Sequence, residues 1–130
     1  MALPRSFQVQ SLVCALVLGV GGCATVPEQA PEQVVKARAQ ARWDALLKGD
    51  IETAYGYLGP GSRAVNSLEA YKASIRKGFW TAAQVESAKC EGDTCEVSAQ
   101  IEYQYRGSRI KTPLAETWIR QQGNWWYVLK

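Results

Sequence analysis

Apolar and polar residues alternate along the stretch that follows residue 95. The even positions from Glu96 to Arg106 are polar, and the odd positions between them are apolar: Val97, Ala99, Ile101, Tyr103 and Tyr105. A period of two is typical of a strand with one buried face and one solvated face. We therefore predict a half-buried β-strand that begins at Cys95.

Three further segments are expected to complete an antiparallel sheet of about four strands. These segments are residues 81–89, 110–121 and 125–129. Turn residues separate the later strands, at Gly107–Ser108 and at residues 122–124. Pro113 marks an edge or a bulge, because proline cannot donate a hydrogen bond to a neighbouring strand.

A helical spacing precedes the strands. Apolar residues recur at intervals of four, four and three, at Val35, Ala39, Trp43 and Leu46. This spacing predicts a helix that begins at Pro31 and ends at Gly49, since proline suits a first helical turn and glycine suits a helix end.

Two shorter helices are expected next. Asp50 is a good cap for the first of them, which the Gly59-Pro60-Gly61 segment ends. Asn66 and Glu69 have capping-box spacing for the second, which ends near Gly78. Three N-terminal helices followed by an antiparallel sheet predict a single α+β domain over residues 31–130.

The N-terminal segment has the pattern of a secretory signal. Arg5 is the single charge before Glu28, and residues 12–18 form an apolar run. That run is far shorter than the roughly 20 residues that span a membrane. We predict that residues 1–22 are a signal peptide.

Val20-Gly21-Gly22-Cys23 resembles the lipobox of bacterial lipoproteins. The resemblance implies cleavage before Cys23, a lipid on its thiol and a short tether over residues 23–30. Ala24 is not the aspartate associated with inner-membrane retention, so the resemblance implies an outer-membrane anchor facing the periplasm. The alternative is an ordinary signal peptide in which Cys23 is incidental.

Composition narrows the candidate chemistry. The 130 residues contain no histidine, so the commonest general base and the commonest metal ligand are both missing. The net charge of +3 is small and the basic residues are scattered along the sequence, so no nucleic-acid partner is expected. We expect no metal and no cofactor.

Cys90 and Cys95 flank a segment that reads as a hairpin loop. Cysteines that face each other across a hairpin can meet disulfide geometry, and the periplasm would oxidise them. The alternatives are a redox pair or a metal pair. The spacing is not Cys-x-x-Cys, and neither histidine nor another mature cysteine could complete a zinc site.

The order of elements and several segments resemble the nuclear-transport-factor-two-like (SnoaL-like) superfamily, a cystatin-like roll. The segments that carry the resemblance are residues 43–50, 54–63, 116–119 and 123–128. The resemblance covers residues 31–130. It implies a curved sheet wrapped around the helices, with a conical pocket that hosts enzymes, ligand binders and interaction modules in different members. Fold alone therefore does not decide function.

Glu116 is the carboxylate whose position matters most. A two-residue turn at Gly123–Asn124 would pair Trp118 with Leu129 and direct Glu116 inward. A three-residue turn would direct Glu116 to solvent, as a solvated or ion-paired glutamate. If it faces inward, the candidate pocket-lining residues are Glu116, Trp118, Tyr103 and Tyr71.

Adjacent tryptophans give a second candidate feature. Trp125 and Trp126 must point to opposite faces of their strand, so one of them should lie outside the main core. An exposed tryptophan is a candidate contact for a protein partner, a dimer mate or peptidoglycan.

These observations favour a non-catalytic accessory lipoprotein whose domain binds an envelope protein or a small apolar ligand. A homodimer is compatible with the same features. The alternatives are a dehydratase- or isomerase-type enzyme that uses Glu116 with Tyr103 or Tyr71, and a purely structural assembly partner.

Overall fold

The computed structural model describes residues 22–23 and 25–130. The predicted signal peptide lies outside the described residues except for Gly22. In the described part, helices come first and strands follow, so the predicted α+β class is confirmed. The elements are α1 Pro31–Lys48, α2 Ile51–Tyr55, α3 Pro60–Val65, α4 Leu68–Ser74, β1 Trp80–Glu91, β2 Thr94–Tyr105, β3 Ser108–Gln121 and β4 Asn124–Tyr127.

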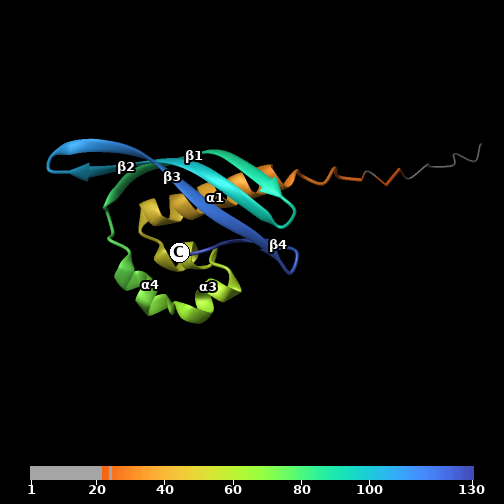
Figure 1. Ribbon diagram of the computed structural model, residues 1–130, viewed down its shortest axis with the longest axis horizontal. Coiled ribbons are helices and arrows are strands. Elements are labelled where there is room, and N and C mark those ends of the chain that lie inside the picture. Colours follow the sequence, from red (N-terminus) through yellow and green to blue (C-terminus); the bar gives the residue numbers. More distant parts are fainter. Residues whose placement is uncertain (1–21, 24) are drawn as a thin grey trace, which may run out of the picture.

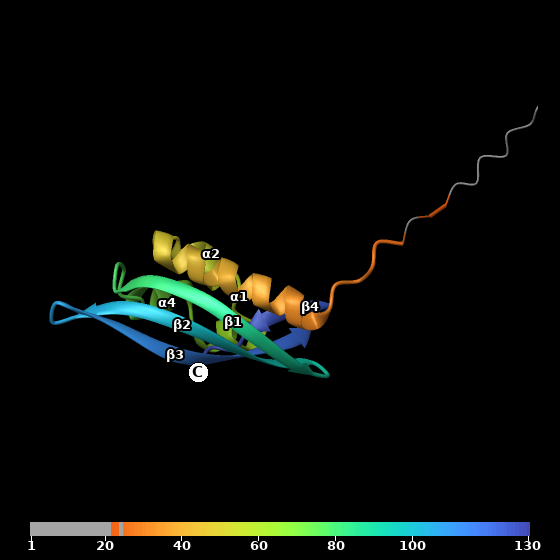
Figure 2. The same ribbon diagram turned by 90° about the horizontal axis from the view of Figure 1, so that it is seen from above.

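The four strands form one antiparallel sheet in the order β1-β2-β3-β4. The sheet is curved, and α1 lies along its concave face, as Figure 2 shows. Helices α3 and α4 lie below α1 and the sheet in Figure 1. The tether leaves the domain at the start of α1 (Figures 1 and 2). Among the described residues, no helix is long and apolar enough to cross a membrane.

Helix α1 buries the face that the spacing predicts. Val35, Ala39, Trp43 and Leu46 are all buried. Gly49 ends the helix at a φ of 74°, a left-handed conformation that suits glycine. Asp50 then caps α2 by accepting a hydrogen bond from the Thr53 amide at 3.2 Å. Hydrogen bonding to the Thr53 side chain, and next to the Thr53 amide, lowers the pKa of the Asp50 carboxyl.

The prediction of three helices is wrong by one, because α3 forms where the sequence predicts a break. Pro60 occupies the first position of α3, where its missing amide proton costs nothing. Asn66 ends α3, and its side-chain amide donates to the Ser62 carbonyl. Ser67, rather than Asn66, caps α4 by accepting a hydrogen bond from the Ala70 amide at 3.2 Å.

The alternation along β2 is confirmed as far as Ile101. Val97, Ala99 and Ile101 are buried, Tyr103 is half-buried, and Tyr105 is 56% exposed. Tyr103 and Tyr105 are less buried because the β2–β3 hairpin extends beyond the helices that cover the rest of the sheet (Figure 1).

Pro113 lies on an edge, as predicted. Strand β4 pairs with β3 only over residues 118–121, so the part of β3 before this pairing has a free side. Proline is tolerated there because no neighbouring strand needs its amide proton.

The hairpin between β1 and β2 carries the predicted disulfide. Cys90 and Cys95 are direct partners in the register, with Cα atoms 4.0 Å apart, and their sulfur atoms are bonded. Cys95 is fully buried. The bond therefore ties two strands that the backbone ladder already pairs.

Reduction of this disulfide is expected to lower the free energy of unfolding by about 2 kcal/mol, because a loop of this length removes little chain entropy. Urea denaturation with and without a reductant measures the difference. Free-thiol labelling of the native, unreduced chain should find neither Cys90 nor Cys95. Labelling of either cysteine, or complete unfolding on reduction, would contradict this account.

Candidate functional site

The turn between β3 and β4 decides which way Glu116 points. It consists of Gln122 and Gly123, both with positive φ (53° and 75°), so Trp118 pairs with Tyr127. The predicted pairing of Trp118 with Leu129 is therefore wrong by two residues. A hairpin turn of this kind needs positive φ at both central positions, and glycine meets that need at the second. Because a shift of two residues keeps each side chain on its face, Glu116 still points inward.

Glu116 is buried at 2% exposure and both of its carboxylate oxygens accept hydrogen bonds. The Arg42 guanidinium of α1 donates from Nη1 to Oε1 at 2.9 Å. The Trp118 indole donates from Nε1 to Oε2 at 3.1 Å. The sequence left two alternatives for Glu116, an inward-facing side chain or a solvated or ion-paired one. In the structure Glu116 points inward and is also ion-paired.

Aromatic rings complete the surroundings of Arg42. Its Cζ atom lies 3.7 Å from the centre of the Tyr127 ring and 5.4 Å from that of Trp43. The negative faces of these rings attract the cation. Arg42 Nε is buried without a hydrogen-bond partner, so ring contacts take the place of a second acceptor.

Tyr127 is protonated at neutral pH in this environment. Burial raises the pKa of its hydroxyl above the ordinary value and outweighs the Arg42 charge, which lowers it. Glu116 and Tyr71 raise the pKa of Tyr127 further. Tyr127 thus offers a proton donor, not a base.

The remaining candidates are divided between two places. Tyr71 is 1% exposed and packs against Tyr55, and its hydroxyl is buried without a hydrogen-bond partner. Tyr103 pairs with Ile110, six residues along β3 from Glu116. At the rise of a strand this separation is about 20 Å, so Tyr103 and Glu116 do not form one site.

None of the four predicted pocket-lining residues lines the principal clefts in the described part of the chain. These four residues are Glu116, Trp118, Tyr103 and Tyr71. The clefts have volumes of about 460, 390, 300 and 280 Å³. The space where the resemblance implies a conical pocket is instead filled by Arg42, Trp118 and Tyr127, which pack around Glu116.

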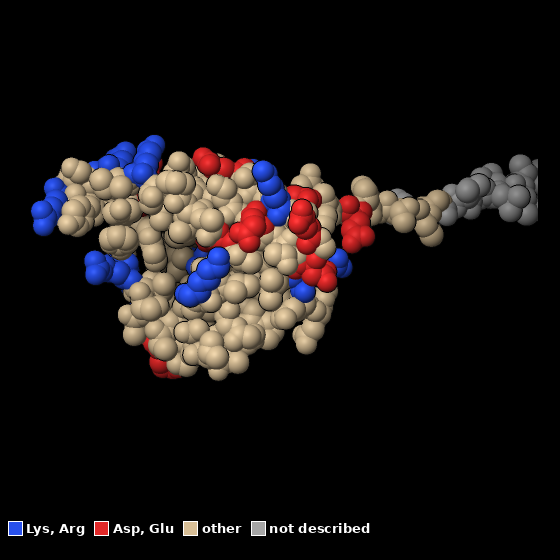
Figure 3. All heavy atoms as spheres, in the orientation of Figure 1, with Lys and Arg blue, Asp and Glu red and all other residues tan. Residues whose placement is uncertain are grey.

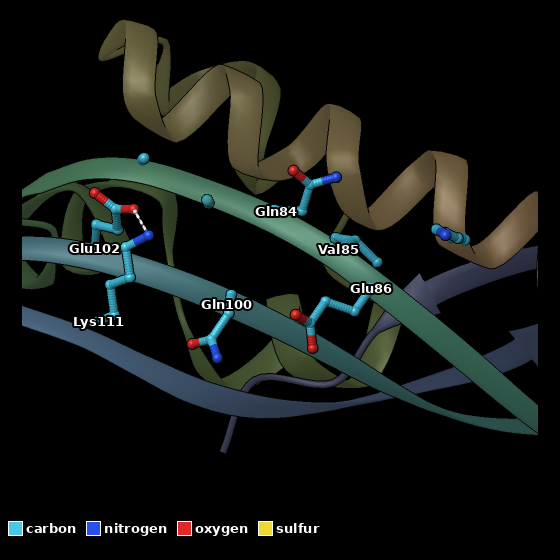
Figure 4. A pocket seen from close by; sticks show the side chains of 9 residues that line it. Gln84, Val85, Glu86, Gln100, Glu102 and Lys111 are labelled. Carbon is cyan, nitrogen blue, oxygen red and sulfur yellow. Dashed lines mark ion pairs between the residues drawn. The ribbon is translucent and has the colours of Figure 1, made fainter.

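The cleft of about 460 Å³ extends from α1 over β1 to the outer face of the sheet (Figure 4). Gln84 points toward α1, whereas Glu102 points toward Lys111, which pairs with it at 3.0 Å (Figure 4). Arg109 lies 3.8 Å from the same carboxylate. This open, polar surface holds its Glu102 in an ion-pair network. Within the described residues, no group of three metal-ligating side chains gathers here or elsewhere.

The two adjacent tryptophans separate as predicted. Trp125 is 5% exposed, whereas Trp126 lies half-buried on the outer face, and its indole donates to the Gln121 carbonyl at 3.1 Å. The guanidinium groups of Arg38 and Arg63 lie 5.7 and 5.3 Å from the Trp126 ring.

Arg42 is the residue that the analysis of the sequence missed. Its position was readable, since it lies seven residues after Val35 and therefore on the buried face of α1. An arginine at such a position signals a buried partner of opposite charge.

No family model matches the chain, and no curated protein matches its sequence. Among the solved structures that share its fold are three bacterial proteins. A SEC-C motif containing protein from Rhodopseudomonas palustris has a TM-score of 0.60 at 14% identity, over 72% of this chain and 73% of its own. A second, from Psychrobacter arcticus, has a TM-score of 0.61 at 11% identity, over 78% and 62%. A protein from Campylobacter jejuni described as an NTF2-like transpeptidase has a TM-score of 0.53 at 14% identity, over 74% and 98%. At these identities the likeness is one of fold alone, and the Campylobacter jejuni structure agrees with an NTF2-like fold.

Proposed function

We propose that the chain is a lipoprotein anchored at Cys23 to the outer membrane, and that its domain is a non-catalytic interaction module exposed to the periplasm. Cys23 is exposed, and so are residues 25–30 before α1. Eight residues from Cys23 to Ala30 reach about 28 Å when fully extended, so the tether would hold the domain close to the bilayer.

One observation carries the non-catalytic part: Glu116 is fully engaged. Proton transfer in catalysis requires a group within hydrogen-bond reach of a substrate. Both oxygens of Glu116 are occupied by Arg42 and Trp118, and its side chain is 1% exposed. The chain has no histidine, and Cys90 and Cys95 are held in the disulfide, so two common sources of such a group are missing.

The interior also disfavours a small apolar ligand. Such ligands bind in clefts that bury most of their surface. The core of this domain is occupied by its own side chains, so a protein partner on the surface is the better supported choice.

An enzyme that uses Glu116 is the second candidate, because polar side chains gather around it. Arg42, Trp118 and Tyr127 surround the carboxylate, and Tyr71 has an unpartnered hydroxyl. This candidate requires the core to open for a substrate, and Tyr103 could not take part.

Intact mass of the chain extracted from membranes tests the anchor. The expected product begins at Cys23 and carries added acyl mass. A product without lipid, or one cut at another position, would overturn the anchored part of the proposal.

A further inference from the structure

Charged residues are unevenly distributed on the face of the domain that Figure 3 shows. On this face a group of Lys and Arg side chains lies at the end opposite the tether, whereas most of the Asp and Glu side chains lie nearer the tether (Figure 3). The basic side chains of the β2–β3 hairpin and of the loop before β1 are Arg76, Lys77, Arg106, Arg109 and Lys111. Although they are scattered in the sequence, the fold brings them to one end. The carboxylate beside them, Glu102, is already paired with Lys111 and Arg109.

Aromatic rings lie beside two of these cations, Arg76 and Arg106, whereas Arg109 and Lys111 pair with Glu102 on the outer face of the hairpin. The Arg76 guanidinium lies 5.5 Å from the Phe79 ring, and Phe79 stacks on Tyr103 at 4.9 Å. Arg106 lies 5.4 Å from the ring of Tyr105, which is 56% exposed. We call the five basic residues at this end, Arg76, Lys77, Arg106, Arg109 and Lys111, the distal shelf. A cleft of about 300 Å³, lined by Ser74, Arg76, Phe79 and Trp80, opens on it.

The β2–β3 hairpin, which carries Arg106, Arg109 and Lys111 of the distal shelf, has a free side along β3. Tyr105 and Ser108 flank a two-residue turn and form a hydrogen-bonded pair, so even-numbered residues of β3 bond to β2. Odd-numbered residues therefore direct their backbone groups to the other side. Thr117 shows this, because its carbonyl accepts from the Val128 amide at 2.9 Å. Arg109 and Lys111 precede the β4 pairing and leave that side open.

We propose that the distal shelf binds an extended acidic segment of a partner protein, which adds as a strand beside Arg109 and Lys111. Arginines beside aromatic rings, such as Arg76 and Arg106, suit carboxylates, and arginine and tyrosine are enriched where proteins bind each other. An open sheet edge supplies backbone hydrogen bonds that a polypeptide can match. The proposal rests on the proposed role as an interaction module and names its surface and partner.

The geometry favours this partner over other anionic surfaces. Phe79 and Tyr103 are half-buried on the concave side, so a flat bilayer would not reach them. An anionic glycan would use the charges but not the strand edge. A second copy is disfavoured, because its acidic end lies beside the tether and would face the bilayer in copies anchored in the same membrane (Figure 3).

Fluorescence anisotropy of a labelled decapeptide of alternating Glu and Val, titrated with the full chain in non-ionic detergent, tests the proposal. We expect the acidic peptide to bind more tightly than peptides of alternating Gln and Val or Lys and Val. The affinity should fall with added salt. Arg76→Gln with Arg106→Gln should weaken binding about fivefold. The matched control, Lys89→Gln with Arg120→Gln at the other end, should leave it unchanged.

A pair of variants at Lys111 separates strand addition from charge. Lys111→Pro and Lys111→Gln both remove the charge, but only proline also removes the outward amide proton. We expect Lys111→Pro to bind about fivefold more weakly than Lys111→Gln, the effect of one lost hydrogen bond. Thermal unfolding checks that both variants fold.

Three results would overturn the proposal. One is equal binding of the Glu–Val and Gln–Val peptides. Another is equal affinity of Lys111→Pro and Lys111→Gln. The third is binding to dextran sulfate as tight as to the peptide, or a preference for phosphatidylglycerol over phosphatidylcholine vesicles that Arg76→Gln with Arg106→Gln removes; these results would assign the shelf to a glycan or to a membrane. None of these outcomes affects the lipid on Cys23, which the intact mass reports separately.

Discussion

Glu116→Gln is expected to lower the free energy of unfolding by about 3–5 kcal/mol, because it leaves the buried Arg42 guanidinium without a counter-charge. Both side chains are almost fully buried, with 5% of Arg42 and 1% of Glu116 exposed. Water therefore cannot take over the solvation of the remaining charge. Urea denaturation with an unchanged slope would report this loss as a lower midpoint.

The matched variants make the result specific. Arg42→Met combined with Glu116→Gln removes both charges and keeps an acceptor for the Trp118 indole, so it should recover most of the lost stability. Glu102→Gln breaks a surface ion pair and should cost about 1 kcal/mol or less. An increase in the free energy of unfolding of Glu116→Gln would contradict a structural role for Glu116. Such an increase is typical of active-site groups, which are often kept at a cost in stability.

Cys23→Ser is expected to abolish lipidation, because serine lacks the thiol that carries the diacylglycerol. The proposed anchor would depend on several acyl chains, each methylene of which contributes about 0.8 kcal/mol. Without them the chain should disappear from the outer-membrane fraction. Metabolic labelling with palmitate, followed by membrane fractionation, measures both effects.

Cys14→Ser is the matched control, since Cys14 lies within the predicted signal peptide. This variant should be labelled and sorted like the unchanged chain. Palmitate on Cys23→Ser, or its loss from Cys14→Ser, would show that the lipid is attached elsewhere.

Much of the fold follows from the periodicity of the sequence. The period of two locates β2, and the spacing of Val35, Ala39 and Trp43 locates α1. These patterns work because each element buries one face. Helix α3 was not predictable in this way, because Gly-Pro-Gly suits both a break and a helix start.

The candidate site was only half predictable. The inward direction of Glu116 depends on a turn at Gln122–Gly123, which the neighbouring Gly-Asn pair obscured. Its partner Arg42 was missed because a charge on an apolar helix face cannot be assigned a mate from one sequence. The distal shelf could not be predicted either, since Arg76 and Arg106 come to the same end only through the overhang of the hairpin (Figure 1).

Chemical labelling of carboxylates tests the central claim, that the core of this domain is closed and Glu116 is structural. Native chain is treated with a water-soluble carbodiimide and an amine, digested, and each glutamate is quantified by mass spectrometry. Exposed Glu69 on α4 serves as the internal control. The account predicts labelling of Glu69 and none of Glu116 until the chain is unfolded. Labelling of native Glu116 at a rate close to that of Glu69 would show an open pocket and contradict the account.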